Sequence, residues 1–189
     1  MSFLHNKVFR KLVLLVILAF SVLTFIFINK ILMINIFIIL SSVVSIYFIF
    51  TETYPIYLLI FLSFVTSYAF YGFLYQFNLP PWVIMLAIMV VFSYLFTYME
   101  QKIGILGNKR LIYLVLFSLV ILEVFLALSY FLINPLNQSI VISIVCYLFV
   151  GFCYTILARH TDNSFRTYLL IAGVSILIIF LSSNWGLLI

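Results

Sequence analysis

The sequence predicts an all-α protein, a polytopic integral membrane bundle of seven transmembrane helices in a single domain over residues 1–189. The chain is 68% apolar and 7% charged, with a mean hydropathy of +1.40, whereas charged residues make up about a quarter of a soluble protein. Twelve of the thirteen charged residues lie before or between seven long apolar runs. No run alternates apolar and polar residues as a transmembrane β-strand would, so helices must satisfy the backbone in hydrocarbon.

Each apolar run has about the 17 to 25 residues that are needed to cross a bilayer as a helix. The runs lie at 12–28, 31–50, 56–75, 82–99, 111–133, 139–158 and 167–187. Only Asn29 and Lys30 separate the first two. This short break predicts a tight antiparallel hairpin.

The later breaks contain residues that favour helix starts. Thr51 and Thr53 offer hydroxyl caps ahead of Pro55, and the segment 78–81 contains two prolines, which are tolerated in the first turn of a helix but not in its interior. The segment 134–139 repeats this pattern before the sixth run, and Asp162, Asn163 and Ser164 precede the seventh.

Orientation follows from the basic residues, which are retained on the cytoplasmic side of a membrane. With the amino terminus inside, Lys30 is the only basic residue that lies outside. Seven crossings then place the carboxyl terminus outside as well. The residues then expected on the cytoplasmic side are Lys7, Arg10, Lys11, Lys102, Lys109, Arg110, Arg159 and Arg166. Trp82 and Trp185 fall at the outer interface, which favours amphipathic rings. We expect a multi-pass protein of the inner (plasma) membrane.

Glu123 is the one charged residue inside an apolar run. It lies 12 residues after Leu111, near the bilayer midplane, where a charged side chain costs about 2.5–3.5 kcal/mol on insertion scales. Because hydrocarbon disfavours the charged form, we expect a neutral acid that donates a hydrogen bond, for example to a hydroxyl of another span. Two interpretations stay open: a proton-coupled or substrate-coordinating site, or a neutral Glu that bridges helices.

The third run carries an aromatic stripe. Phe64, Tyr68, Tyr71 and Tyr75 recur at steps of four, three and four, which places them on one helical face. Their hydroxyls could line a polar cavity, although packing is the commoner role of such stripes. The candidate substrate-binding or proton-binding residues are therefore Glu123, Tyr68 and Tyr71.

Other chemistry finds little support in the residues. The basic residues behind the net charge of +5 are divided among small clusters, so no nucleic-acid partner is predicted. Cys146 and Cys153 are seven residues apart on one helix, about 10.5 Å along its axis, too far for a mutual disulfide. His160 and Asp162 lack the further ligands or nucleophile of a metal or catalytic site. We predict no catalytic residue, cofactor or metal.

A resemblance rests on the stretch from Glu123 to Leu132, residues 147–151, Arg166-Thr167-Tyr168 and Trp185. The chain resembles a group of multi-pass membrane proteins from small-genome candidate-phylum bacteria, which carry a similar Glu-x-Phe-x-x-Leu-Ser-x-Leu pattern in a late span. The proline that follows the pattern in that group is displaced here to Pro135. Because the group has no assigned activity, the resemblance implies a membrane location and a bacterial source only.

Three hypotheses about function follow. The leading one is a non-enzymatic membrane scaffold or partner subunit. Its expected partners are the lipid bilayer and either another membrane protein or further copies of itself. The second is a small proton-coupled transporter or permease in which Glu123 titrates. The third is an intramembrane enzyme acting on a lipid-linked substrate, using Glu123 or the His160 and Asp162 pair.

Overall fold

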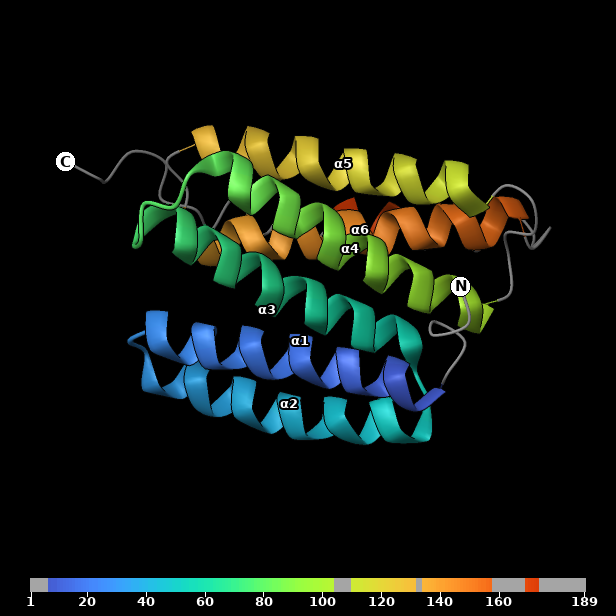
Figure 1. The fold of residues 1–189 in the computed structure, drawn as a ribbon, viewed down its shortest axis with the longest axis horizontal. Helices are drawn as coiled ribbons and strands as arrows, with labels where there is room; N and C mark the ends of the chain where they lie inside the picture. The colour runs from blue at the N-terminus through green and yellow to red at the C-terminus, as the bar shows by residue number, and fades with distance from the viewer. Residues whose placement is uncertain (1–6, 104–109, 132–133, 158–168, 174–189) are drawn as a thin grey trace.

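All regular structure in the described part of the chain is helical. The computed structural model describes residues 7–103, 110–131, 134–157 and 169–173 (Figure 1). Its long helices are α1 (Lys7–Ile28), α2 (Leu32–Thr51), α3 (Pro55–Tyr75), α4 (Pro81–Ile103), α5 (Arg110–Tyr130) and α6 (Pro135–Leu157). By length and composition, all 6 could cross a membrane. This architecture is compatible with an integral membrane protein.

The first six predicted spans are confirmed as helices, with shifted ends. α1 begins at Lys7 and α4 continues to Ile103, because Lys, Arg, Glu and Gln are good helix formers and long basic side chains can reach the interface. α6 begins at Pro135, four residues before the predicted start. Of the predicted seventh span, residues 169–173 are described and are helical; its remainder lies outside the described residues.

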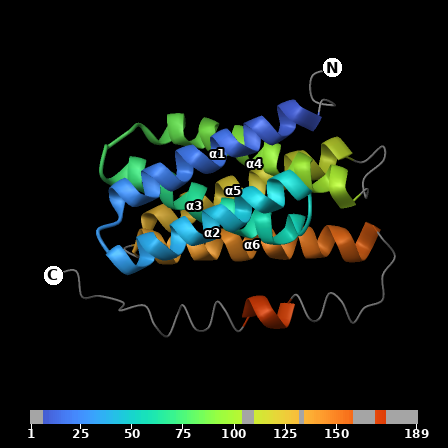
Figure 2. The ribbon, with the colours of Figure 1, turned by 90° about the horizontal axis from the view of Figure 1, so that it is seen from below.

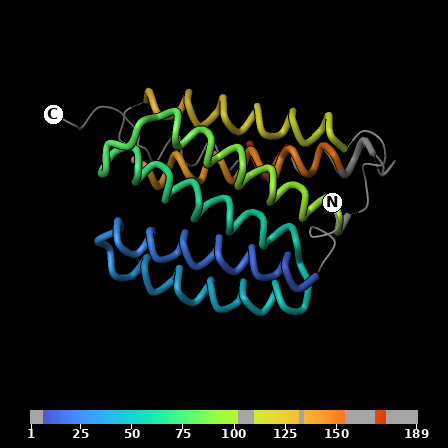
Figure 3. The backbone as a smooth tube through the Cα atoms, in the orientation of Figure 1, coloured from blue at the N-terminus to red at the C-terminus, as the bar shows by residue number. Residues whose placement is uncertain are grey.

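Successive helices run up and down, roughly alongside one another (Figure 3). One end of the bundle, which we call the basic end, therefore contains the start of α1, the α2–α3 turn, the end of α4 and the start of α5 (Figure 1). Lys7, Arg10, Lys11 and Arg110 lie at the basic end, and Lys30 lies at the opposite end.

α3 lies at the centre of the bundle. It packs against α1, α2, α4 and α6, and 67% of its spanning stretch is buried, compared with 22% for α5 and 17% for α2. Helices α1 and α3 approach closely near the opposite end, where a Cβ atom added to Gly72 would overlap Cδ1 of Ile28. α2 and α5 lie at the two edges (Figure 1). The helical turn 169–173 lies beside α6 (Figure 2).

The hairpin between α1 and α2 is as short as predicted and is closed by two amides. Asn29 Nδ2 donates to Asn35 Oδ1 at 3.0 Å, and Asn35 Nδ2 donates to the Asn29 carbonyl at 2.9 Å. The second bond satisfies the Asn29 carbonyl, which directly follows α1 and has no intrahelical partner.

The α2–α3 turn differs from its prediction. Tyr54 is the N-cap of α3 and makes no capping hydrogen bond through its side chain, so the expected hydroxyl cap is wrong. The hydroxyl of Thr51 instead contacts Thr53 Oγ1 at 2.7 Å and the Tyr47 carbonyl at 2.9 Å. Glu52 and Tyr54 have φ of 57° and 49°, a left-handed conformation that turns the chain sharply before Pro55. The two hydroxyls therefore make their hydrogen bonds at the end of α2 and do not cap α3.

Arg10 joins three parts of the basic end. Its Nη1 donates a short hydrogen bond to Gln101 Oε1 of α4, its Nη2 lies 3.8 Å from Glu52 Oε1 of the turn, and its guanidinium lies over the ring of Tyr98 at 5.6 Å. Lys11 supports the same carboxylate, with Nζ 3.5 Å from Glu52 Oε1. Because the Arg10 side chain is only 15% exposed, these contacts are partly shielded from solvent.

We therefore expect Arg10→Ala to destabilise the bundle. A hydrogen bond to a charged group contributes about 1.5–3 kcal/mol, and partial exposure places the expected loss at the lower end of that range. The measurement is the thermal unfolding midpoint of the detergent-purified protein. Lys30→Ala, an exposed basic residue at the opposite end, is the matched control and should leave the midpoint unchanged. Equal effects of the two substitutions would contradict a joining role for Arg10.

Candidate functional site

The predicted aromatic stripe on α3 divides between two neighbours. Tyr68 packs against Phe25 of α1, with ring centroids 4.2 Å apart. Tyr71 stacks on Phe125 of α5 at 4.2 Å, and its hydroxyl donates to the Phe125 carbonyl at 3.2 Å. Both tyrosines are buried. Their rings therefore make interhelical packing contacts with different helices.

A buried amide completes the opposite end of the bundle. Gln138 is 0% exposed, and its Nε2 donates to the carbonyls of Leu128 and Phe131 at 2.7 and 3.3 Å and to the hydroxyl of Tyr75 at 3.0 Å. The Tyr75 hydroxyl donates onward to the Ser129 carbonyl at 3.2 Å. Gln138 thus hydrogen-bonds to the backbone at the end of α5, where the Leu128 carbonyl also accepts from the Phe131 N–H at 3.1 Å.

Sequence reasoning did not single out Gln138. Its only signal was a polar side chain three residues after Pro135, in the first turn of α6. Polar residues at helix starts are common on protein surfaces, so the pattern did not distinguish a buried amide from an exposed one. It is the packing of α6 against α3 and α5 that buries Gln138.

Further hydroxyl pairs join the helices within the spans. Ser21 and Thr66 oxygens lie 2.9 Å apart between α1 and α3, and those of Ser93 and Ser118 lie 2.7 Å apart between α4 and α5. Such interhelical hydrogen bonds contribute about 0.6–2 kcal/mol in membrane proteins. These hydroxyls therefore have hydrogen-bond partners on neighbouring helices.

Glu123 lies on the outside of the bundle. It is exposed on α5, whereas Phe117, Ser118, Ile121 and Phe125 form the buried face of that helix. Glu123 and Phe125 are two positions apart, about 200° around a helix, so the two side chains point to nearly opposite sides. No described residue forms a hydrogen bond or ion pair with Glu123.

The three candidate residues are therefore not brought together. Tyr68 faces α1, Tyr71 faces the inner side of α5, and Glu123 faces away from the bundle. The expected hydroxyl partner of Glu123 on another span is not found among the described residues. Any chemistry of Glu123 belongs to the outer surface of α5.

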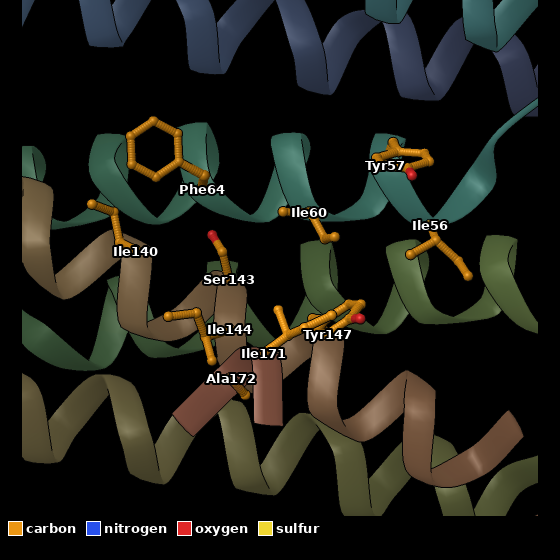
Figure 4. Close-up of a pocket in the computed structure, with 10 residues that line it drawn as sticks. All are labelled: Ile56, Tyr57, Ile60, Phe64, Ile140, Ser143, Ile144, Tyr147, Ile171 and Ala172. Atoms are coloured by element: carbon orange, nitrogen blue, oxygen red, sulfur yellow. The ribbon is translucent and has the colours of Figure 1, made fainter. Parts of the chain in front are cut away.

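The structure contains a cavity of about 610 Å³ elsewhere, between α3, α6 and the turn 169–173. In Figure 4, side chains from these three elements converge on it, and the lining is mostly apolar. The lining residues are Ile56, Tyr57, Ile60, Phe64, Ile140, Ser143, Ile144, Tyr147, Ile171 and Ala172. No described lining residue comes from α5.

Cys146 and Cys153 are free and buried, in keeping with small packing side chains. No group of three or more His, Cys, Asp or Glu residues that could hold a metal ion occurs among the described residues. His160 and Asp162 lie outside the described residues.

Comparisons with protein-family models, curated proteins and solved structures find no match to this chain.

We expect Gln138→Leu to lower the thermal unfolding midpoint in detergent. A leucine of similar size removes the hydrogen bonds from Gln138 Nε2 to the partly buried carbonyls of Leu128 and Phe131, at a cost of about 0.5–1.5 kcal/mol. Gln76→Leu makes the same replacement at an exposed position and should have little effect. A Gln138→Leu protein as stable as wild type would show that the amide does not support the end of α5.

Proposed function

We propose that this protein is a membrane scaffold or partner subunit, and that it associates with another membrane helix through the exposed side of α5. The observation that carries the proposal is the exposed carboxyl of Glu123 halfway along a helix able to cross a membrane. We define the α5 outer face as the exposed residues Ile112, Leu116, Leu119, Glu123, Ala127 and Tyr130.

Hydrocarbon makes an exposed carboxyl at this depth unfavourable. Lipid tails neither donate nor accept hydrogen bonds, so a group that faces them loses its hydration without compensation. A neighbouring helix that offers a hydrogen-bonding group removes this penalty, and polar side chains are accordingly a recognised cause of helix association in membranes. Glu123 therefore favours a protein neighbour over lipid.

α2 provides an internal comparison because it is also a peripheral helix. Between Ile36 and Ile46 every exposed residue of α2 is apolar. Its hydroxyls bond their own helix, with Ser42 Oγ donating to the Ile39 carbonyl at 2.7 Å and Ser45 Oγ to the Ser41 carbonyl at 2.8 Å. The exposed side of α2 thus suits lipid, and that of α5 does not.

Assembly accounts for the geometry better than transport or intramembrane catalysis. A proton-coupled transporter that uses Glu123 requires a water-accessible path to that carboxyl. The cavity of about 610 Å³ is lined from α3, α6 and the turn 169–173, and Glu123 is not among its lining residues. A scaffold needs only the exposed face itself.

We further propose seven spans, with the amino terminus in the cytoplasm and the carboxyl terminus outside, in the inner membrane of a bacterium. The proposal is supported by the separation of Lys7, Arg10, Lys11 and Arg110 at the basic end from Lys30 at the opposite end. Basic residues beside spans are retained on the cytoplasmic side. The basic end is then cytoplasmic.

This topology is tested by reporter fusions in bacterial cells. Alkaline phosphatase, which is active only outside the inner membrane, should be active when fused after Ile189 and inactive when fused after Ile103. Green fluorescent protein should give the reverse pattern. An inactive phosphatase and a fluorescent protein at Ile189 would contradict seven spans with the amino terminus inside.

Association through α5 is tested by affinity purification in mild detergent followed by native mass spectrometry. Wild type should be recovered in a complex with membrane protein. Glu123→Leu should reduce that complex, by roughly tenfold for a hydrogen-bond contribution of about 1–2 kcal/mol.

Two controls accompany this measurement. Glu123→Gln keeps a donor and an acceptor and should preserve the complex. Val44→Ala alters the exposed side of α2 and should also preserve it. A wild-type protein that is consistently monomeric, with no co-purifying partner, would overturn the proposed function.

A further inference from the structure

We infer that the partner at the α5 outer face is a second copy of this chain, with the two Glu123 carboxyls hydrogen-bonded to each other across a twofold axis. The inference rests on the proposed function and names the partner. It follows from three features of the α5 outer face: the chemistry of its polar group, the depth of that group, and the shape around it.

The chemistry is self-complementary. A neutral carboxylic acid has one O–H donor and a carbonyl acceptor, so two such acids can satisfy each other reciprocally without any charge in hydrocarbon. A twofold interface presents the same patch from both subunits, and residues near the axis meet their own copies. Glu123 is the only ionisable side chain on the α5 outer face apart from the phenol of Tyr130.

Pairing with a cation on a different protein is less favourable. A Lys or Arg at this depth would bring its own insertion penalty of about 2.5–3.5 kcal/mol. Two neutral acids avoid that penalty. Charge considerations therefore favour a copy of the same face over a basic partner helix.

Membrane insertion supplies the depth match. Basic flanking residues give every copy of a chain the same orientation, so a twofold axis between copies runs along the membrane normal. The two α5 helices are then parallel, and each residue lies at the same depth as its counterpart. Glu123 meets Glu123 without any adjustment of register.

The surrounding residues suit a parallel helix pair. Leu116, Glu123 and Tyr130 recur at seven-residue intervals, and Ala127 lies four residues after Glu123 and three before Tyr130, which is the spacing of a left-handed coiled-coil seam. A single polar residue in such a seam is known to set register and oligomeric state. Ala127 follows one turn after Glu123, and its small side chain permits close approach of the two backbones.

Disulfide cross-linking in native membranes tests the inference. In a full-length background with Cys146→Ala and Cys153→Ala, we introduce Ala127→Cys on the α5 outer face, with Val44→Cys on the exposed side of α2 as the matched control. After mild oxidation, Ala127→Cys should give a covalent dimer and Val44→Cys should not. A disulfide requires Cα atoms within about 7 Å, so the signal reports direct α5–α5 contact.

Variants at position 123 identify the paired group. Adding Glu123→Leu to Ala127→Cys should reduce the cross-linked dimer about tenfold. Adding Glu123→Gln should retain it, because an amide also donates and accepts. Cross-linking that is unaffected by Glu123→Leu would overturn the pairing of the carboxyls.

Failure of this inference is distinguishable from failure of the proposed function. If Ala127→Cys gives no dimer while wild type still co-purifies a different membrane protein in a manner sensitive to Glu123→Leu, the second copy is wrong and the partner-subunit function stands. If Ala127→Cys gives no dimer and no complex is recovered, both are wrong. Equal cross-linking of Ala127→Cys and Val44→Cys would indicate random collision and would also overturn the inference.

Discussion

Burial of α3 is the constraint on which the rest of the bundle depends. Because α3 packs against α1, α2, α4 and α6, each of these helices has one side occupied by it, and α2 and α5 are left at the edges (Figure 1). The close approach at Gly72 and Ile28 and the stacking of Tyr71 on Phe125 show how α3 combines small and large side chains to contact neighbours on different sides. The bundle is organised around one central helix.

A second constraint is that polar groups in hydrocarbon need hydrogen-bond partners within the protein, and the described polar residues find them in two ways. Within the spans, serines and threonines bond their own helix or a hydroxyl of another. At the ends, longer side chains join separate segments, as Arg10 does at the basic end and Gln138 does at the opposite end. Glu123 does neither and is exposed. Its exposure on a peripheral helix is the observation on which the proposed association through α5 rests.

Element positions were largely predictable because hydropathy, charge clusters and prolines act locally along the chain. The first six spans follow from the apolar runs, with ends that differ where good helix formers extend a span, as at Lys7 and Ile103. The hydroxyls of Thr51 and Thr53 did not predict the N-cap of α3 correctly, because these two side chains hydrogen-bond each other at the end of α2. Local competition between the two helices decided that outcome.

The sequence by itself determined that the chain forms apolar helices long enough to span a membrane, and that Glu123 lies within one of them, because both properties depend on residues adjacent in the chain. Only the tertiary structure decided which way Glu123 faces. α5 is apolar on nearly all sides, so no periodicity distinguishes its packed side from its exposed side. The positions of α3, α4 and α6 make that choice: they bury Phe117, Ile121 and Phe125 and leave Glu123 outside.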